Sequence, residues 1–248
     1  MSGRPLIFGH RGAAGLAPEN SLPGFERAVA LGADGVECDV HLSADGVPVV
    51  IHDAAIGRTT DGGGTVESLM ARELARLALR RGGGPLPTLD AVVDLLAPTG
   101  LLLNVEIKTG QRGRRYDGIE AAVVRSLARA GMTERAIVSS FTWEYVANVL
   151  ALARPRATLG LLDRRGLAGA GGATRALASA RALGFDGLCL PAECLRGLRL
   201  GPADRAAVWV YRADTRAGLR RAFAAGIGAV ITDRPDLALA LRDDDPPA

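Results

Sequence analysis

The chain has 248 residues, 48% of them hydrophobic, which is ample material for one large domain or two small ones. Its net charge of +3 comes from interspersed basic and acidic residues, so the clustered cationic face that nucleic-acid binding needs is not expected. Three cysteines without a CxxC pair argue against a disulfide framework and favour a reducing compartment. Since MSGRPLIFGH lacks a signal peptide's apolar region and no run approaches the ~20 apolar residues of a membrane span, we expect a cytoplasmic protein without stable membrane insertion.

Short apolar runs alternate with helical patterns from one end of the chain to the other. The predicted strands are 6–10, 35–42, 47–52, 101–107, 136–140, 157–162, 187–190, 208–212 and 229–232. Amphipathic patterns such as 119–131 and 216–226 separate most of them, each with a glycine placed to cap the helix end. Alternation of this kind predicts a parallel sheet.

The third predicted strand is the exception to the parallel order. Only SADG joins it to the second, whereas a parallel connection needs about a dozen residues or more. Segment 47–52 is therefore expected to run antiparallel, as a hairpin turned at Asp45-Gly46. Eight parallel strands remain, which predicts an α/β fold: a (β/α)8 TIM barrel over residues 1–248 with an extra antiparallel hairpin strand.

Two further segments complete this prediction. Residues 55–85 are rich in glycine, hold one short helical pattern at 67–80 and show no strand, so we expect a small insertion near the barrel mouth. A helix over 88–97 then leads back into the barrel. Residues 243–248 are expected to form a frayed tail.

Side-chain alternation places charged residues of two strands on one face. In GVECDVHL, Glu37, Asp39 and His41 share a face, and the alternate residues are apolar and suit packing against helices. In LNVEIKTG, Glu106 and Lys108 share a face in the same way. Both sets lie at the carboxyl ends of their strands, where barrel enzymes build their active sites.

Three carboxylates that converge on a barrel mouth repel one another unless a cation or a shared proton intervenes. Oxygen-only ligands favour a hard cation, so Glu37, Asp39 and Glu106 predict one divalent metal ion, Mg²⁺ or Ca²⁺, rather than zinc. The alternative is that each acid pairs with a neighbouring arginine or lysine. The convergence of three acids favours the metal.

Two histidines are expected at the same place. The hairpin brings His52 near Glu37 and Asp39, and His10, at the end of the first strand, faces the same point. Two imidazoles beside a metal site suggest a general acid and a general base. His41 faces inward further along the rim and is expected to take no direct part.

Lys108 is the only lysine, since the other 29 of the 30 basic residues are arginines. A compact ammonium on a flexible stem could reach a phosphate oxygen beside a metal, where a guanidinium is too bulky. Arg11, next to His10, could clamp a phosphate with its planar fork. Chance survival of one lysine in an arginine-favouring genome is the alternative.

Several motifs together resemble one family, the glycerophosphodiester phosphodiesterases. They are GHRGAAGLAPENS (9–21), GVECDVHLSADGVPVVIHD (35–53), RTTDGGGTV (58–66), LPTLDAVVDLL (86–96), NVEIK (104–108) and ITDRPD (231–236). The resemblance covers nearly the whole chain in order. It implies a (β/α)8 barrel of the type that includes phosphatidylinositol-specific phospholipase C.

The resemblance also implies an activity and a site. Members hydrolyse glycerophosphodiesters to sn-glycerol 3-phosphate and an alcohol such as choline, ethanolamine or glycerol, so the expected partner is a small-molecule glycerophosphodiester. The nucleophile is either the glycerol 2-hydroxyl, through a cyclic phosphate, or water. The implied roles are metal binding by Glu37, Asp39 and Glu106, acid–base catalysis by His10 and His52, and phosphate binding by Arg11 and Lys108.

Other motif residues have two interpretations each. Glu19 and Asn20 could touch the metal site or glycerol, although Asn20 or Ser21 could equally cap the following helix. Trp209 and Phe141 could line the pocket, with core packing the alternative and the preferred one for Phe141. Asp233 is expected to cap the last helix or brace the barrel.

One segment departs from the family pattern. Where the family usually shows W-x-V-N, this chain has WVYR (209–212). The extra Arg212 at the mouth favours a substrate that carries another anion. A lysophospholipase D acting on lysolipids is a second possible enzyme, and a non-catalytic phosphate-binding barrel is the alternative from another class; the oligomeric state is left open.

Overall fold

Eight parallel strands close into a barrel in the computed structural model, which describes residues 4–244. The barrel strands are β1 (Leu6–Gly9), β2 (Gly35–Leu42), β6 (Leu102–Ile107), β7 (Ala136–Ser140), β8 (Ala157–Leu161), β9 (Gly187–Pro191), β10 (Val208–Tyr211) and β11 (Ala229–Thr232). Each pairs in parallel with its neighbours in chain order, and β11 pairs with β1 to close the ring. The predicted TIM barrel is confirmed.

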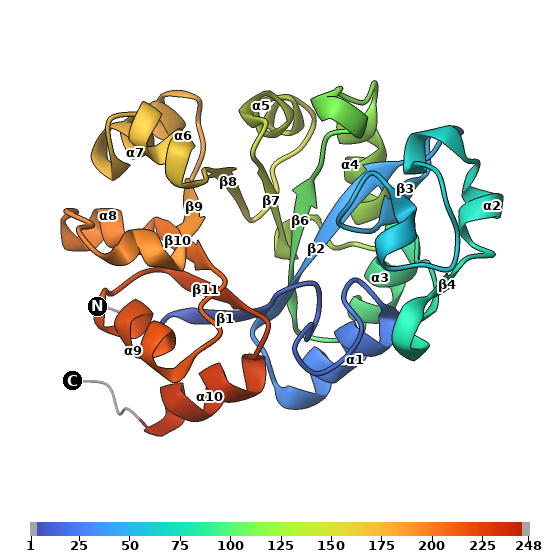
Figure 1. Cartoon of the computed structure of the whole chain (residues 1–248). Helices are drawn as coiled ribbons and strands as arrows, with labels where there is room; N and C mark the ends of the chain where they lie inside the picture. Colours follow the sequence, from blue (N-terminus) through green and yellow to red (C-terminus); the bar gives the residue numbers. More distant parts are fainter. Residues whose placement is uncertain (1–3, 245–248) are drawn as a thin grey trace.

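Helices surround the barrel (Figure 1). They are α1 (Leu22–Leu31), α3 (Leu89–Leu96), α4 (Ile119–Arg129), α5 (Trp143–Leu152), α6 (Arg164–Gly169), α7 (Ala173–Ala182), α8 (Pro202–Ala206), α9 (Arg216–Ala224) and α10 (Pro235–Asp244). Their apolar faces bury the outward residues of the strands, including Val36, Cys38 and Val40 of β2. A separate interior cluster around Phe8 and Trp209 fills the barrel itself, so the polar site has to lie beyond this plug, at one end.

The antiparallel hairpin strand is also confirmed. The short strand β3 (Pro48–Val50) pairs with β2, with Val50 opposite Val40 and Pro48 opposite Leu42. β3 is the last strand in the strand order and lies beside β2. The excursion follows β3 in the chain.

The excursion over 55–85 is more structured than its sequence indicates. It contains a short helix, α2 (Ala71–Leu74), three 3-10 turns and two strands of two residues, β4 (Ala78–Leu79) and β5 (Gly84–Pro85), which pair antiparallel. The expectation of no strand was therefore wrong, and the helix is shorter than 67–80. The excursion has its own apolar cluster, made of Val49, Ile51, Ile56, Val66, Leu74, Leu79 and Leu86. This tertiary cluster, rather than local propensity, holds the short pieces in place.

The predicted frayed tail over 243–248 is wrong for its first two residues and untested for the rest. Residues 243 and 244 belong to α10, whereas 245–248, the rest of the predicted tail, lie outside the described residues. Within 4–244, no helix combines the length and the apolar character that crossing a membrane requires.

Candidate active site

Three carboxylates meet at the carboxyl end of the barrel. Glu37 and Asp39 are alternate residues of β2, and Glu106 of β6 lies directly opposite Asp39 in the strand register. One oxygen from each of the three lies within 4.8 Å of the others, and all three side chains are buried. The two strands therefore place the cluster through alternation and pairing alone.

Burial and mutual repulsion set the charge of this cluster. Burial, reinforced by the neighbouring Asp39 carboxylate, raises the pKa of Glu37 to about 8. Although burial opposes ionisation of Asp39 as well, the Lys108 ammonium and the Arg11 guanidinium beside it hold the pKa of that carboxyl well below its usual range. Without a metal, the cluster thus holds one proton on Glu37 at neutral pH.

The cluster is able to hold a divalent cation. Its donors are carboxylate oxygens only, the set that Mg²⁺ and Ca²⁺ prefer. Glu37 Oε1 is buried and accepts no hydrogen bond among the described residues. A buried carboxylate oxygen without a partner is costly, and a metal ion would supply the missing interaction.

Lys108 follows the end of β6 and bridges two of the carboxylates. Its Nζ lies 2.6 Å from Glu106 Oε1 and 3.3 Å from Asp39 Oδ1. These negative neighbours outweigh burial and raise the pKa of Lys108, so the ammonium stays charged. An ammonium has three donors, so one remains after these two contacts.

His10 belongs to a dyad with a carboxylate from the far end of the chain. Its backbone N–H donates to Thr232 O, which extends the β1–β11 ladder by one residue. Its Nδ1 donates to Asp233 Oδ1 at 2.6 Å, and its Nε2 lies 4.0 Å from Glu37 Oε2. Burial opposes protonation, but the hydrogen bond to Asp233 raises the pKa of His10 above 6.5. Asp233 therefore fixes the ring and leaves Nε2 available to exchange a proton.

His52 is held in the same manner. Its Nδ1 donates to Asp53 Oδ1 at 2.5 Å, and the other oxygen of Asp53 accepts from Arg58 Nε. Arg58 comes from the excursion, and its guanidinium also donates to both oxygens of Glu19, at 2.7 and 3.0 Å. The excursion, which supplies Arg58, thus fixes the orientation of His52 through Asp53.

His41 contacts the backbone of His52 and so supports its position. Its Nε2 donates to the backbone carbonyl of His52 at 3.0 Å, and its Nδ1 lies 2.8 Å from the Tyr116 hydroxyl. Burial lowers the pKa of His41, so the ring is neutral and its Nδ1 lone pair faces the Tyr116 hydroxyl, which also lies 3.3 Å from Glu67 Oε2. The expectation that His41 takes no direct part fits this position.

The loop after β1 carries strained residues that serve the site. Arg11 has a positive φ of 49°, its backbone N–H donates to Glu37 Oε2 at 3.0 Å, and its Nη1 donates to Glu19 at 2.9 Å. Asn20, with φ 52°, donates from Nδ2 to Asp39 Oδ2 at 2.9 Å. Ser21, not Asn20, caps α1 by accepting from the Gly24 N–H. Asn20 therefore orients a carboxylate of the cluster.

These groups surround a cavity of about 250 Å³. Its lining residues are His10, Arg11, Glu37, His52, Asn104, Glu106, Lys108, Phe141, Leu161, Cys189, Tyr211, Arg212 and Ile231. One wall is thus charged and the opposite wall, from β7 to β11, is largely apolar.

Three aromatic residues differ in their relation to this cavity. Trp209 lies deeper, 8% exposed, with its ring 4.8 Å from that of Phe8, and Tyr211 two residues later lines the cavity in its place. Phe141 was expected in the core, but it is 46% exposed and its ring lies 5.9 Å from Lys108 Nζ. The preference for core packing of Phe141 was therefore wrong.

The sequence matches the model of the glycerophosphoryl diester phosphodiesterase family over residues 10–237. The chain belongs to this family. The resemblance noted in the sequence and the expected enzyme class, a phosphoric diester hydrolase, are thereby confirmed.

Individual family members are similar over nearly their whole length. A glycerophosphodiester phosphodiesterase of Caldanaerobacter subterraneus subsp. tengcongensis is 32% identical over 96% of this chain and 98% of its own. A crystal structure of a putative glycerophosphoryl diester phosphodiesterase from Agrobacterium tumefaciens superposes with a TM-score of 0.87, at 28% identity, over 98% of both chains. An Oleispira antarctica phosphodiesterase, solved with the product sn-glycerol-3-phosphate, superposes with a TM-score of 0.81 at 25% identity, over 97% of both chains.

Sequence reasoning missed the partners that orient the two histidines of this phosphodiesterase. Asp233 was expected to cap a helix or brace the barrel, and Asp53 and Arg58 were not singled out, although HD and RTTD are in the motifs quoted. The adjacency of Asp53 to His52 was the one local signal. Asp233 lies 223 residues from His10, so only barrel closure reveals that pair.

Proposed function

We propose that this protein hydrolyses glycerophosphodiesters to sn-glycerol 3-phosphate and an alcohol, with a divalent metal ion held by Glu37, Asp39 and Glu106. The observation that carries the proposal is the pair of histidines, each with Nδ1 bound to a carboxylate, beside a cluster made only of carboxylates. A barrel that only bound phosphate would have no need of two oriented proton carriers. The Oleispira antarctica relative, solved with sn-glycerol-3-phosphate as its product, supports the choice of substrate.

The metal would be Mg²⁺ or Ca²⁺, since the cluster offers oxygen donors only. When bound, it would withdraw charge from a non-bridging oxygen of the phosphoryl group. Asn20 and Lys108 keep Asp39 and Glu106 oriented for this role, by contacts of 2.9 and 2.6 Å.

His10 and His52 act as the acid–base pair in this proposal. Because Asp233 and Asp53 accept from the two Nδ1 atoms, each histidine exchanges protons through Nε2. One accepts the proton of the attacking hydroxyl, and the other donates a proton to the departing alkoxide. The carboxylates also stabilise the positive charge that each ring carries while protonated.

Arg11 and Lys108 hold the phosphate. Both line the cavity, and both are partly buried against carboxylates that keep them charged and positioned. Their remaining N–H groups neutralise charge on the phosphoryl oxygens as it shifts in the transition state. Glu19 takes part by bridging Arg11 and Arg58, at 2.9 and 2.7 Å.

The shape of the cavity favours a small substrate over a lysolipid. A volume of about 250 Å³ suits a glycerophosphoryl group and is too small to enclose a long acyl chain. The leaving group extends past Tyr211 toward Arg212, whose side chain is 64% exposed and whose Nε lies 3.8 Å from Asp214. Arg212 would attract an anionic leaving group, so Arg212→Asn should change the ranking of substrates.

The test is release of glycerol 3-phosphate from glycerophosphocholine after chelation and again with Mg²⁺ or Ca²⁺ restored. We expect no release after chelation and recovery with metal, and lysophosphatidylcholine should be a poor substrate. A His10→Ala, His52→Ala double variant that stays folded should be inactive. Activity that survived this double change would refute the acid–base assignment, and absence of release with either metal would refute the proposed reaction.

A further inference from the structure

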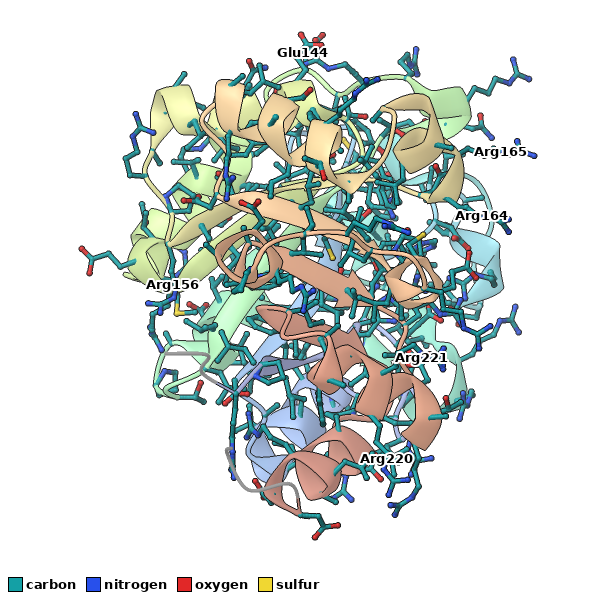
Figure 2. The ribbon with its side chains drawn as sticks, turned by 90° about the vertical axis from the view of Figure 1, so that its left-hand side faces the viewer. Glu144, Arg156, Arg164, Arg165, Arg220 and Arg221 are labelled. Carbon is teal, nitrogen blue, oxygen red and sulfur yellow. The ribbon has the colours of Figure 1, made fainter. Side chains whose placement is uncertain are left out.

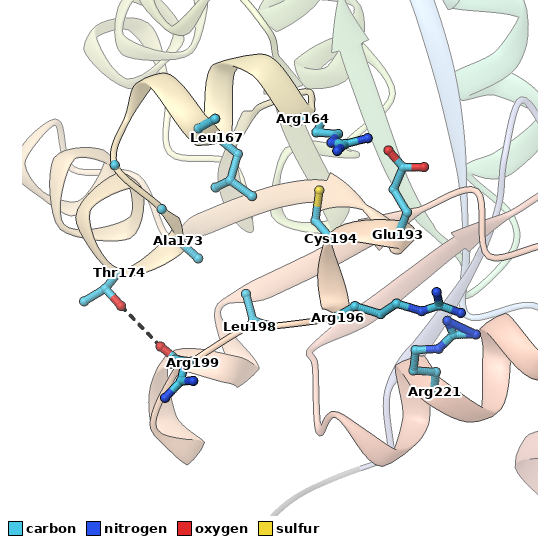
Figure 3. Close-up of a pocket in the computed structure, with 14 residues that line it drawn as sticks. Arg164, Leu167, Ala173, Thr174, Glu193, Cys194, Arg196, Leu198, Arg199 and Arg221 are labelled. Carbon is cyan, nitrogen blue, oxygen red and sulfur yellow. Dashed lines mark hydrogen bonds between the residues drawn. The ribbon is translucent and has the colours of Figure 1, made fainter.

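A second hollow lies on the flank of the barrel, outside the active site. Most barrel strands are followed by a helix of eight to eleven residues, but β9 and β10 are joined only by a 3-10 turn and the five-residue helix α8. A cleft of about 950 Å³ remains between α6 and α7 on one side and α9 on the other (Figure 3). The residues that line this cationic cleft are Arg164, Leu167, Ala168, Gly171, Gly172, Ala173, Thr174, Glu193, Cys194, Arg196, Gly197, Leu198, Arg199 and Arg221.

The cleft concentrates positive charge that the protein does not neutralise. Four arginines line it against one glutamate, and within 4–244 none of these arginines has a carboxylate oxygen within 4.0 Å. Some arginines elsewhere do have a carboxylate partner, as Arg181 has Asp204 and Arg234 has Asp236. In Figure 3 the side chains of Arg196 and Arg221 extend toward one another, although like charges repel. An anion between such groups would relieve this repulsion.

The lining also restricts what kind of anion fits. Among these residues there is no aromatic side chain on which a nucleotide base could stack. The arginine fork matches the oxygens of a phosphate, and Thr174 and Glu193 offer hydrogen bonds to hydroxyl groups. The wall formed by Leu167, Ala173 and Leu198 accommodates a short carbon skeleton. A volume of about 950 Å³ is enough for a small organic molecule with several charges.

We propose that the cationic cleft is a binding site for a non-aromatic phosphate ester of a small polyol, separate from the active site. It shares no lining residue with the active-site cavity. The two hollows are nevertheless neighbours, because the Tyr211 hydroxyl of the active-site wall donates to Leu162 O at 3.2 Å, two residues before Arg164. A ligand bound in the cleft would therefore be connected to the active-site mouth through the short segment 162–164.

The protein contains its own reporter for this site. Cys194 lines the cleft and is partly exposed, whereas Cys38 and Cys189 are fully buried. A neutral alkylating reagent such as iodoacetamide should therefore modify Cys194 first, with no charge of its own to compete for the arginines. If only the free cleft reacts, ligand slows alkylation by 1 + [L]/Kd, about tenfold at ten times Kd.

The experiment follows alkylation of Cys194 by mass spectrometry in purified full-length protein, at constant ionic strength and pH. Glycerol 3-phosphate and inorganic phosphate are the probes, and glycerol is the uncharged control. We expect protection by glycerol 3-phosphate, weaker protection by inorganic phosphate and none by glycerol. Protection by inorganic phosphate equal to that by glycerol 3-phosphate would overturn the choice of a polyol ester.

Matched variants locate the binding. Arg196→Ala with Arg221→Ala should raise the half-protecting concentration about tenfold or more, because each removes a charge-assisted contact. The control is Arg165→Ala with Arg220→Ala, at the sequence neighbours of two cleft residues, Arg164 and Arg221 (Figure 2). It removes the same charge from side chains that do not line the cleft, so it should leave protection unchanged. Equal protection in both double variants, or no protection at all, would refute the site.

One more variant separates the cleft from the active site. Lys108→Ala removes a proposed phosphate contact from the active-site cavity only, so protection of Cys194 should persist in it. Loss of protection would show that the signal arises at the mouth, and the cleft would not be a site. Because alkylation does not depend on catalysis, this outcome is independent of whether the proposed hydrolysis occurs.

Discussion

The variant Asp233→Asn tests whether catalysis needs Asp233 to orient His10, or needs only a polar side chain beside the His10 ring. The carboxylate accepts from His10 Nδ1 at 2.6 Å, and the two side chains are only 25% and 12% exposed. An amide can instead donate from its nitrogen to Nδ1, which would move the ring proton to Nε2 and remove the lone pair from the cavity side. Asp233→Ala loses the hydrogen bond but does not impose the wrong tautomer.

The magnitude follows from the bond that is lost. A hydrogen bond to a charged group contributes about 1.5–3 kcal/mol, and tenfold in rate corresponds to about 1.4 kcal/mol, so kcat should fall about 10- to 150-fold. KM should change little, because Asp233 does not line the cavity. The Asn variant should be the slower of the two.

The assay is steady-state release of glycerol 3-phosphate across pH. Because the hydrogen bond to Asp233 raises the pKa of His10, its loss should move the corresponding limb of the pH–rate profile to lower pH. Asp236→Asn is the matched control, since Asp236 pairs with Arg234 on the surface and should leave kcat and the profile unchanged. Asp233→Asn with kcat within about twofold of the unmodified enzyme, far below the loss expected for such a bond, would refute the reasoning.

Four further predictions concern the metal, the metal-free protein, the excursion and the loop after β1. Since the pKa of Glu37 is raised from 4.5 to about 8, Mg²⁺ must displace a proton from Glu37 below that pH. Titration calorimetry should therefore show the affinity for Mg²⁺ rising about tenfold per pH unit up to pH ~8 and levelling above it. The same shift should make the metal-free protein less stable to heat as pH rises from 4.5 to 8, because the folded form keeps a proton that the unfolded chain has lost; a flat profile would contradict this. Arg58→Ala should lower kcat about fivefold, or ~1 kcal/mol, through Asp53 and His52, whereas Arg80→Ala in the same excursion should not. Gly12→Ala should lower the free energy of unfolding by more than ~2 kcal/mol, because φ is 88° and the new Cβ would lie 2.6 Å from Gly24 C. Gly32→Ala is the control: φ is 78° but the space around the new Cβ is open, so the cost should be ~1 kcal/mol. Chemical denaturation measures both.

The barrel could be predicted from sequence because its signals are local. A strand of period two followed by a helix of period 3.6 recurs along the chain, and the predicted bounds of β2, β7 and β11 agree with the structure. The four residues SADG were enough to make β3 antiparallel. Alternation in β2 and β6 also predicted which face carries Glu37, Asp39 and Glu106, because facing within a strand does not depend on the rest of the fold.

What the sequence could not determine are contacts between segments that meet only when the barrel closes. The partner of His10 follows β11, and Arg58 of the excursion reaches back to Glu19 in the loop after β1; no periodic pattern encodes either distance. Strand pairing alone decides that Tyr211 rather than Trp209 reaches the cavity, and that Phe141 is exposed at its rim. The paired β4 and β5 are too short for a propensity signal, and the cationic cleft lies where only a 3-10 turn and the five-residue helix α8 join β9 to β10. Local sequence thus determined the elements and the faces of their side chains, while barrel closure decided which side chains meet, since such pairs depend on geometry summed over all eight strands.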